Sequence, residues 1–217
     1  IGIAIVSTKN TNLRSPKYFF IPSPSKIDIY NFTLLYYNIN GDNMEKQLST
    51  KCIYDGVVVK VKKDEVLCEN GITSIRECVS APGGVAILAV IDNKVLLVKQ
   101  YRYVVQEETI ELPAGKIEQN EDLAICALRE LEEETGYSAK EMNKIFTFYP
   151  TPGFCSEVLH IYEAKNIFKL EAPKEMDEDE VINSYFLDLE EAYKQVLDGT
   201  IKDSKTMIAI QYAYQNM

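Results

Sequence analysis

The residues best placed to do chemistry are three glutamates within five positions, Glu130, Glu133 and Glu134. In a helix with about 100° per residue, Glu133 and Glu134 lie about −60° and +40° around the axis from Glu130, whereas Glu132 points away. Carboxylates gathered on one face repel each other, and bound Mg²⁺ or Mn²⁺ would relieve that repulsion because these cations prefer hard oxygen ligands. The alternative is a solvated acidic helix face, and the spacing alone leaves both interpretations open.

These glutamates need a helix to bring them together, and the sequence predicts one over 120–135. Asn120 is a suitable N-cap, and Glu121 and Asp122 follow it in the first turn, where the helix dipole favours negative charge. Apolar residues recur at spacings of three and four and predict one buried stripe: Leu123, Ala127, Leu128 and Leu131. Gly136 is placed to end the helix in a left-handed conformation. The helix therefore has one side in the core and presents the carboxylates on the other.

The wider segment around the glutamates has the spacing G-x5-E-x7-R-E-U-x-E-E-x-G-U, in which U is a bulky apolar residue, from Gly115 to Tyr137. This spacing resembles the Nudix box, although an aliphatic residue is commoner where Tyr137 stands. The resemblance implies hydrolysis of a nucleoside diphosphate linked to another group. It also implies roles for the matching positions: metal ligation by Glu130, Glu133, Glu134 and the Ala114 carbonyl, a catalytic part for Glu133, and structural support from Gly115, Glu121, Arg129 and Gly136.

Segments outside the box, at 100–103, 111–115 and 149–154, resemble one Nudix subfamily, the ADP-ribose pyrophosphatases. The resemblance implies substrate contacts for five residues: Arg76, Arg102, Glu111, Pro152 and Glu157. An arginine such as Arg102 suits a phosphate because its planar guanidinium donates two parallel hydrogen bonds. Each residue also has a plainer interpretation, as a turn proline or as a solvated charge at a strand edge.

An acidic loop at 175–180 bears on the mechanism. Carboxylates that bind metal are poor bases, because the cation stabilises their ionised form. Relatives in the subfamily take a base from a mobile loop at this place in the chain, which implies Glu178, with Glu180 as second choice. Loop placement suits a base that closes over bound substrate, and the alternative is a solvated acidic loop.

Together these features predict metal-dependent hydrolysis of ADP-ribose to AMP and ribose 5-phosphate. Two or three Mg²⁺ ions would connect the box carboxylates to the diphosphate, and Glu178 would help to align or deprotonate the attacking water. One alternative is a Nudix hydrolase of another nucleoside diphosphate sugar. Another is a Nudix-shaped binding module without catalysis, although such modules usually lose the box carboxylates that this chain keeps.

The elements around the box predict an α/β fold: a Nudix-type α/β/α sandwich with a mixed sheet, preceded by a small antiparallel N-terminal sheet. Asp188 caps a helix through Leu197, and Asp203 or Ser204 caps a terminal helix through about Tyr214. Strands are expected from the β-branched and apolar runs at 57–61, 72–79, 85–91, 95–98, 144–149, 158–164 and 182–187.

Three regions are expected along the chain. Residues 1–43 differ in composition, with four basic residues, two acidic ones and no Glu. They are a structured extension, a flexible one, or sequence upstream of a start at Met44, and we favour the last. Residues 44–80 form the N-terminal β segment, and 81–217 form the hydrolase domain. The resemblance implies a homodimer in which the N-terminal sheet crosses to the partner and helps to bind adenine.

Charge, hydropathy and cysteine content exclude several classes of protein. A formal net charge of −10 argues against a nucleic-acid partner, which needs a basic face. No apolar run reaches the roughly 18 residues that a membrane span requires, so no membrane partner is expected. The five cysteines are scattered without a CxxC pair, which predicts neither a disulfide framework nor structural zinc and favours a reducing cytoplasm. His160, the single histidine, is expected to be a packed or surface residue.

Overall fold

The computed structural model describes residues 45–172 and 181–216, which divide into two compact units. One unit comprises 45–49 with 65–75, and the other comprises 50–64 with 76–172 and 181–216. The extension predicted at 1–43 lies outside the described residues. Within the described part of the chain, no helix is long and apolar enough to cross a membrane.

The N-terminal strands are β1 (Lys46–Asp55), β2 (Lys60–Leu67) and β3 (Thr73–Ser80), which form the predicted small antiparallel sheet in the order β1-β2-β3. The strand expected at 57–61 begins three residues later, at Lys60. The amide of Gly56 donates to the carbonyl of Val59 at 3.0 Å, so Val57 and Val58 lie in the turn between β1 and β2, whereas Val61 lies in β2. The turn closed by Gly56 and Val59 outweighs the strand preference of Val57 and Val58.

The larger sheet is mixed, as predicted, with the order β10-β5-β4-β9-β8, while β6 pairs with β5 and β7 pairs with β4. β4 and β9 are parallel, whereas the other pairs of neighbouring strands in this sheet are antiparallel. β8 is much longer than the strand predicted at 144–149. The strands are β4 (Gly84–Ile91), β5 (Lys94–Arg102), β6 (Glu107–Glu111), β7 (Ala114–Lys116), β8 (Tyr137–Phe148), β9 (Leu159–Lys169) and β10 (Asn183–Asp188).

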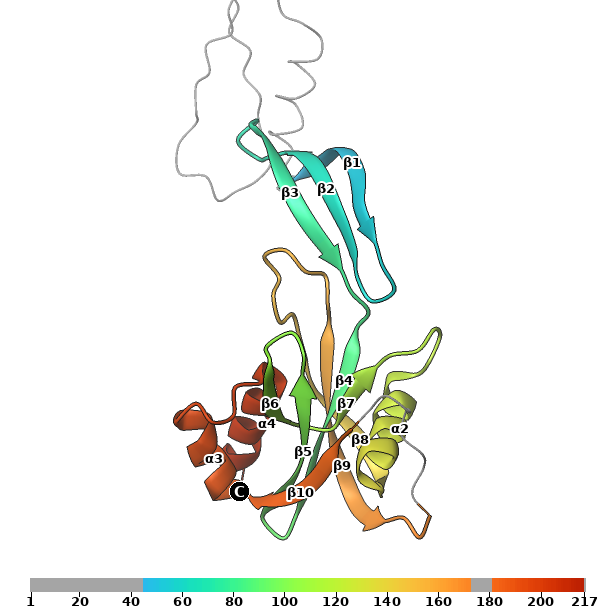
Figure 1. Ribbon diagram of the computed structural model, residues 1–217, viewed down its shortest axis with the longest axis vertical. Coiled ribbons are helices and arrows are strands. Elements are labelled where there is room, and N and C mark those ends of the chain that lie inside the picture. The colour runs from blue at the N-terminus through green and yellow to red at the C-terminus, as the bar shows by residue number, and fades with distance from the viewer. Residues whose placement is uncertain (1–44, 173–180, 217) are drawn as a thin grey trace, which may run out of the picture. The chain divides into compact units, whose positions relative to one another are not determined.

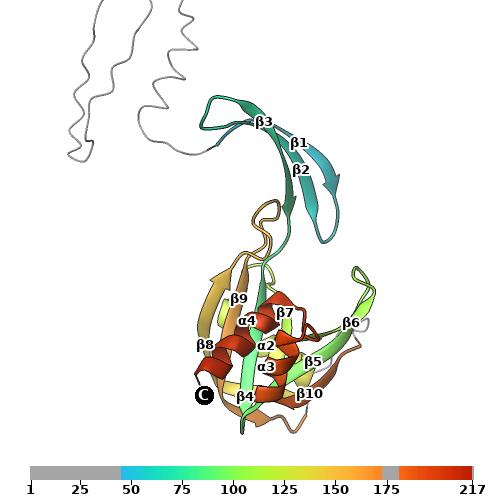
Figure 2. The ribbon, with the colours of Figure 1, turned by 90° about the vertical axis from the view of Figure 1, so that its left-hand side faces the viewer.

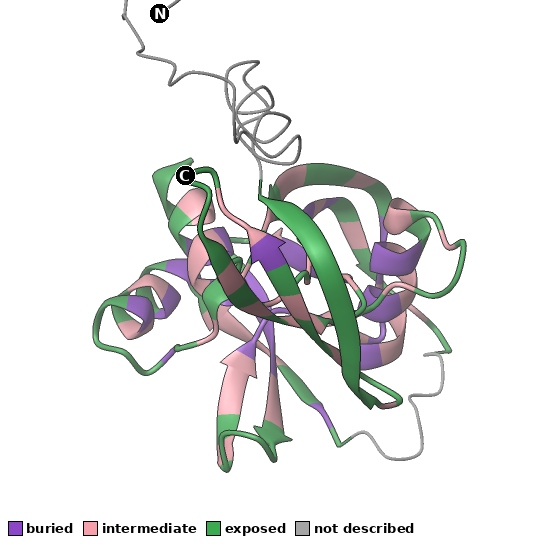
Figure 3. Cartoon of the chain, turned by 90° about the horizontal axis from the view of Figure 1, so that it is seen from above, coloured by how far each residue is buried: buried purple, intermediate pink, exposed green. Residues whose placement is uncertain are grey.

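Helices cover both faces of this sheet, which confirms the predicted sandwich (Figure 1, Figure 2). On one face α2 (Leu123–Thr135) packs over a core that includes Val85, Ile87 and Leu131. On the other face α3 (Leu189–Leu197) and α4 (Ser204–Gln215) pack over a core that includes Leu88 and Leu97. Figure 3 shows the buried positions gathered in the strands and on the facing sides of the helices.

The ends of α2 differ from the prediction at one terminus. Asp122 is the N-cap, and its carboxylate accepts the amides of Ala124 and Ile125 at 2.9 and 3.2 Å. Asn120, predicted as the cap, instead has a positive φ of 64° and lies in the preceding turn. At the other end Gly136 has φ 69°, which confirms the left-handed cap. Asp188 and Asp203 cap α3 and α4 as predicted.

Candidate active site

The box glutamates lie where α2 meets the short strand β7. Glu134 accepts the amide of Ala114 at 2.9 Å, which joins the C-terminal half of the helix to the start of the strand. Glu130 lies against Gly115 so closely that a Cβ atom on that glycine would be 1.9 Å from the Glu130 carboxyl carbon. Only glycine allows this approach without displacing the carboxylate. β7 in turn pairs with the buried strand β4, so the helix and the strand hold each other in place.

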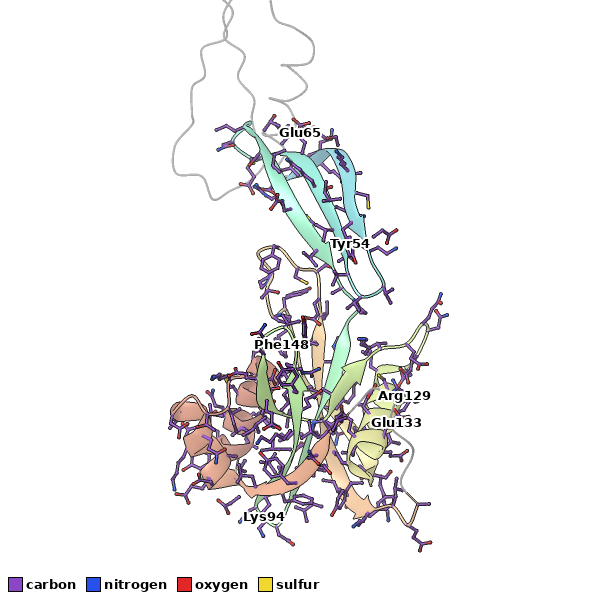
Figure 4. All side chains as sticks on the ribbon, in the orientation of Figure 1. Tyr54, Glu65, Lys94, Arg129, Glu133 and Phe148 are labelled. Atoms are coloured by element: carbon purple, nitrogen blue, oxygen red, sulfur yellow. The ribbon has the colours of Figure 1, made fainter. Side chains whose placement is uncertain are left out.

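Arg129 connects the acidic residues of the box. Its Nε donates to Glu121 at 2.9 Å, and its Nη1 lies 2.7 Å from Glu130 and 3.0 Å from Glu133. Figure 4 labels Arg129 and Glu133 on the outer side of α2, one turn apart. Nη2 also donates to the carbonyl of Lys116 at 3.3 Å. These contacts support the predicted structural role of Arg129 and Glu121.

Electrostatics agrees with that role. Hydrogen bonds from Arg129 lower the pKa of Glu121 to about 2 even though burial opposes the shift. The same carboxylates raise the pKa of Arg129 above its already high ordinary value. Glu121 and Arg129 are therefore ionised at neutral pH, and the arginine offsets part of the repulsion among the acidic residues around it.

The residues at this junction fit a divalent cation in their chemistry. Glu130 and Glu134 are 9% and 5% exposed and supply hard carboxylate oxygens, and the backbone of Ala114 runs beside them. In residues 45–172 and 181–216, no three acidic, histidine or cysteine side chains already converge as a cation site. The carboxylates instead contact Arg129 and the Ala114 amide. Metal binding would therefore require these side chains to exchange partners.

A second polar cluster lies at the ends of β5 and β6. The guanidinium of Arg102 donates to the two carboxylate oxygens of Glu111 at 2.7 and 2.8 Å. Lys205 and Thr109 donate to the same carboxylate at 2.5 and 2.6 Å. Burial alone would raise the pKa of Glu111, but the hydrogen bonds from Arg102 and the charge of Lys205 outweigh it and lower the pKa to about 2. Glu111 is thus an ionised, buried partner of Arg102.

The remaining predicted site residues among those described lie on β3 and in the loop between β8 and β9. Arg76 lies half-buried on β3. Pro152 and Glu157 lie in the loop between β8 and β9, the first exposed and the second half-buried. Two backbone hydrogen bonds join that loop to Val79, which lies three residues after Arg76 on β3. The amide of Val79 donates to the carbonyl of Phe154 at 2.8 Å, and its carbonyl accepts the amide of Ser156 at 2.9 Å. The predicted bases Glu178 and Glu180 lie outside the described residues.

Comparison with known proteins identifies the family. The family model of the NUDIX domain matches residues 81–209. The chain belongs to the Nudix family. It is 45% identical over 169 residues to a methanol dehydrogenase activator of Bacillus methanolicus and 44% identical over 169 residues to an ADP-ribose pyrophosphatase of Bacillus subtilis (strain 168). Each match covers 77% of this chain and 91% of the relative. The chain is also similar in structure to an ADP compounds hydrolase solved by crystallography, with a TM-score of 0.71 and 18% sequence identity. The match covers 79% of this chain and 92% of the hydrolase chain, and it supports the fold.

Sequence reasoning missed one group in this Nudix domain, at the start of α4. Asp203 was predicted as a cap, but the burial of Lys205 and Thr206 was not expected. Thr206 accepts the amide of Leu112 at 2.7 Å and donates to Asp203 at 2.5 Å. A lysine and a threonine directly after a helix cap are ordinary surface residues in most sequences, so their spacing gave no signal. His160, predicted to be a packed or surface residue, is half-buried on β9, and its Nδ1 lies 2.9 Å from the hydroxyl of Thr147.

Proposed function

We propose that this Nudix protein hydrolyses the pyrophosphate linkage of ADP-ribose and releases AMP and ribose 5-phosphate. The observation that carries the proposal is the 44% identity with a Bacillus subtilis ADP-ribose pyrophosphatase, spread over 91% of that enzyme. The complete acidic set on α2 supports it, because a binding module would have no need of Glu130, Glu133 and Glu134 together.

Mg²⁺ or Mn²⁺ is the cofactor that we propose. Glu130, Glu133, Glu134 and the Ala114 carbonyl would hold it, since all four supply the oxygen ligands that these cations prefer. When bound, such a cation neutralises phosphate charge and activates water. The net charge of −10 makes this neutralisation necessary for an anionic substrate. Arg129 and Glu121 would keep the glutamates on one side of α2 while the ligand carboxylates exchange partners.

Arg102 is the residue that we propose to bind a substrate phosphate. The side chain of Arg102 is 46% exposed, whereas that of its partner Glu111 is 3% exposed. The buried carboxylate therefore holds one edge of the guanidinium and leaves the rest of it accessible. The contacts of Glu111 support a role in orienting Arg102 rather than in touching the substrate. Arg76, Pro152 and Glu157 remain proposed substrate contacts, and the tie between Val79 and the β8–β9 loop supports grouping them.

The base that we propose is Glu178, with Glu180 as second choice. Either would deprotonate or align the water that attacks phosphorus in line. Glu133 is the least satisfactory base among the candidates, because it contacts Arg129 at 3.0 Å and its charged form would be stabilised further by a bound cation.

Two substitutions test this mechanism. Glu134→Gln and Glu178→Gln should each lower kcat on ADP-ribose by about 100-fold or more with the thermal unfolding midpoint unchanged. Glu190→Gln is the matched control, because Glu190 is an exposed glutamate on α3 that pairs with Lys194. Near-normal turnover in both test variants would contradict the mechanism.

The substrate is tested separately, with ADP-ribose and other nucleoside diphosphate sugars compared at fixed Mg²⁺. The proposal expects the highest kcat/KM on ADP-ribose. A different nucleoside diphosphate sugar with a higher value would leave the Nudix mechanism in place and overturn the substrate.

A homodimer in a reducing cytoplasm completes the proposal. Large apolar side chains of the N-terminal strands are about half exposed, which supports a covering partner: Leu48 49%, Ile53 54%, Tyr54 58% and Ile75 48%. All five cysteines are free thiols, which supports a reducing compartment. Light scattering after size exclusion should give twice the mass of the chain, 24.7 kDa, and a monomer at micromolar concentration would contradict the dimer.

A second activity is favoured by the relative from Bacillus methanolicus, a methanol dehydrogenase activator at 45% identity. We propose that this chain also activates a methanol dehydrogenase, and that the candidate active site on α2 serves this activity. Adding the protein to a methanol dehydrogenase should raise its rate, and Glu134→Gln should not. No increase with wild-type protein would refute this activity, and an equal increase with the variant would separate it from hydrolysis.

A further inference from the structure

The first turn of α4, which here means Asp203, Lys205 and Thr206, contacts the end of β6 at Glu111. Its lysine is buried, although lysine is among the residues least often found inside a protein. We propose that Lys205 is a positioning residue: acting through Glu111, it holds the Arg102 guanidinium in the orientation that receives a substrate phosphate. This inference rests on the proposed function, because it requires an anionic substrate at Arg102.

The contacts of Glu111 show how a lysine can act on an arginine that it does not touch. Oε1 accepts Nε of Arg102 at 2.7 Å and the hydroxyl of Thr109 at 2.6 Å. Oε2 accepts Nη2 of Arg102 at 2.8 Å and Nζ of Lys205 at 2.5 Å. A bidentate pair requires both oxygens to lie near the plane of the guanidinium, and the terminal torsion of a glutamate is soft. The added bonds on each oxygen restrict that torsion and so fix the plane.

Burial gives the cluster an inner and an outer side. The side chains of Glu111 and Lys205 are 3% and 10% exposed, whereas that of Arg102 is 46% exposed. Within the part of the chain that the structure describes, no hydrogen bond or ion pair engages Nη1 of Arg102. The guanidinium therefore keeps donors for an anion on its outer side while its inner edge is bound.

Lys205 also affects the charge that Arg102 presents. Arg102 and Lys205 face the carboxylates of Glu111 and Asp203, and the charge of Glu134 also acts on Arg102. Without Lys205, Arg102 alone would face these negative charges, and much of its attraction for a phosphate would be cancelled. The effect acts on the inner side of the cluster, where Glu111 and Lys205 are buried and charge interactions are weakly screened. Loss of Lys205 should therefore weaken substrate binding more than it slows the chemical step.

A general loosening of α4 is the competing explanation, and the contacts of Thr206 make it testable. Thr206 accepts the amide of Leu112, two residues before Ala114, whose own amide donates to Glu134. A loosened helix would therefore disturb the metal-ligand segment as well as Arg102. A positioning role confined to Arg102 leaves Mn²⁺ binding unchanged, so direct titration with Mn²⁺ in the absence of substrate separates the two explanations.

The experiment is a double-mutant cycle in the full-length protein with ADP-ribose as substrate. Lys205→Met should raise KM about tenfold, the effect of losing one charged hydrogen bond, with kcat within about threefold of wild type. Arg102→Met should raise KM at least as much, and the double variant should match Arg102→Met alone, because Lys205 then has nothing to orient. Lys205→Arg should restore most of the loss. Lys202→Met is the matched control, since Lys202 pairs with Glu107 at the exposed surface nearby.

The outcomes are distinguishable. If KM effects of Lys205→Met and Arg102→Met multiply in the double variant, or if Mn²⁺ affinity falls with Lys205→Met, the positioning role is refuted. If Arg102→Met leaves KM unchanged, the proposed phosphate contact itself fails, whatever Lys205 does. Should Lys205→Met not fold, Lys205→Gln replaces it in the same cycle, because Gln keeps a donor for Glu111 while removing the charge.

Discussion

Replacing Gly115 with alanine would place a methyl group where the Glu130 carboxylate now lies. The added Cβ would be 1.9 Å from the carboxyl carbon and 2.0 and 2.2 Å from its oxygens, against ordinary contacts of 3.4–4 Å. Either the carboxylate moves by about 1.5 Å or β7 moves away from α2, since a contact of this kind cannot be compressed. β7 is paired with the buried strand β4, so the carboxylate is the group that gives way.

The methyl group would keep the Glu130 carboxylate away from the backbone at Gly115, beside the Ala114 carbonyl with which it would share a metal. Ligand distances in metal sites hold to about 0.2 Å, and a misplacement of about 1 Å in an active site can lower a rate about 100-fold. We therefore expect Gly115→Ala to weaken Mn²⁺ binding at least tenfold and to lower kcat on ADP-ribose about 100-fold. Mn²⁺ binding is measured by electron paramagnetic resonance of the free ion, and turnover by release of AMP at saturating metal.

Gly153→Ala is the matched control for this substitution. A Cβ atom there would meet nothing within 4 Å, and the residue is exposed. It reports the effect of stiffening the unfolded chain, which is expected to be within about 1 kcal/mol. Mn²⁺ affinity and turnover of Gly115→Ala within threefold of the control would show that Glu130 adjusts freely, and the role assigned to the glycine would be wrong.

Three further substitutions or conditions test the scaffold. The pKa of Glu111 is about 2 in the folded protein against an ordinary value of 4.5, so its ionised form contributes about 3 kcal/mol to the free energy of unfolding. This contribution is present above pH 4.5 and is lost as the pH falls toward 2. Urea unfolding at pH 6 and pH 3 should therefore show a smaller loss of stability in Glu111→Gln than in wild type. Asp122→Ala should cost about 1 kcal/mol by removing the cap of α2, and an unchanged melting temperature would refute the cap. Thr206→Val should lower the free energy of unfolding by about 2 kcal/mol, because the buried amide of Leu112 loses its acceptor. A loss below about 0.5 kcal/mol in urea unfolding would mean that water replaces the hydroxyl.

The spacing of apolar residues correctly predicted the helix that buries one face. Prediction from residue type was wrong where a local turn competes with a strand or a helix start. The stripe that includes Ala127 and Leu131 predicted α2, and both residues are fully buried. The valines at 57–59 favour a strand by residue type, but a hydrogen bond between Gly56 and Val59 closes a turn there. Asn120 and Asp122 are both good caps, and sequence alone could not show that Asn120 would adopt the left-handed conformation that places Asp122 at the helix start.

The site was predictable only where its residues share one helix. Glu130, Glu133 and Glu134 follow from 3.6-residue geometry, because their spacing fixes the face that they occupy. Their present contacts, with the Ala114 amide and with Arg129, depend on how β7 approaches and could not be derived from spacing. Lys205 lies 94 positions from Glu111 in the chain, and no local pattern relates residues at that distance.

The arginines of the two clusters are held in opposite ways, and the difference explains why an acidic chain would need a cation to bind a diphosphate. Arg129 is 23% exposed and directs its donors inward to Glu121, Glu130 and Glu133, so its charge offsets the box and little of it is available to a ligand. Arg102 is anchored on one edge and 46% exposed, so its charge can act outward. One outward guanidinium would not balance a diphosphate placed beside three glutamates, and divalent cations held by those glutamates would convert the same carboxylates from a repulsive surface into the means of holding the proposed substrate.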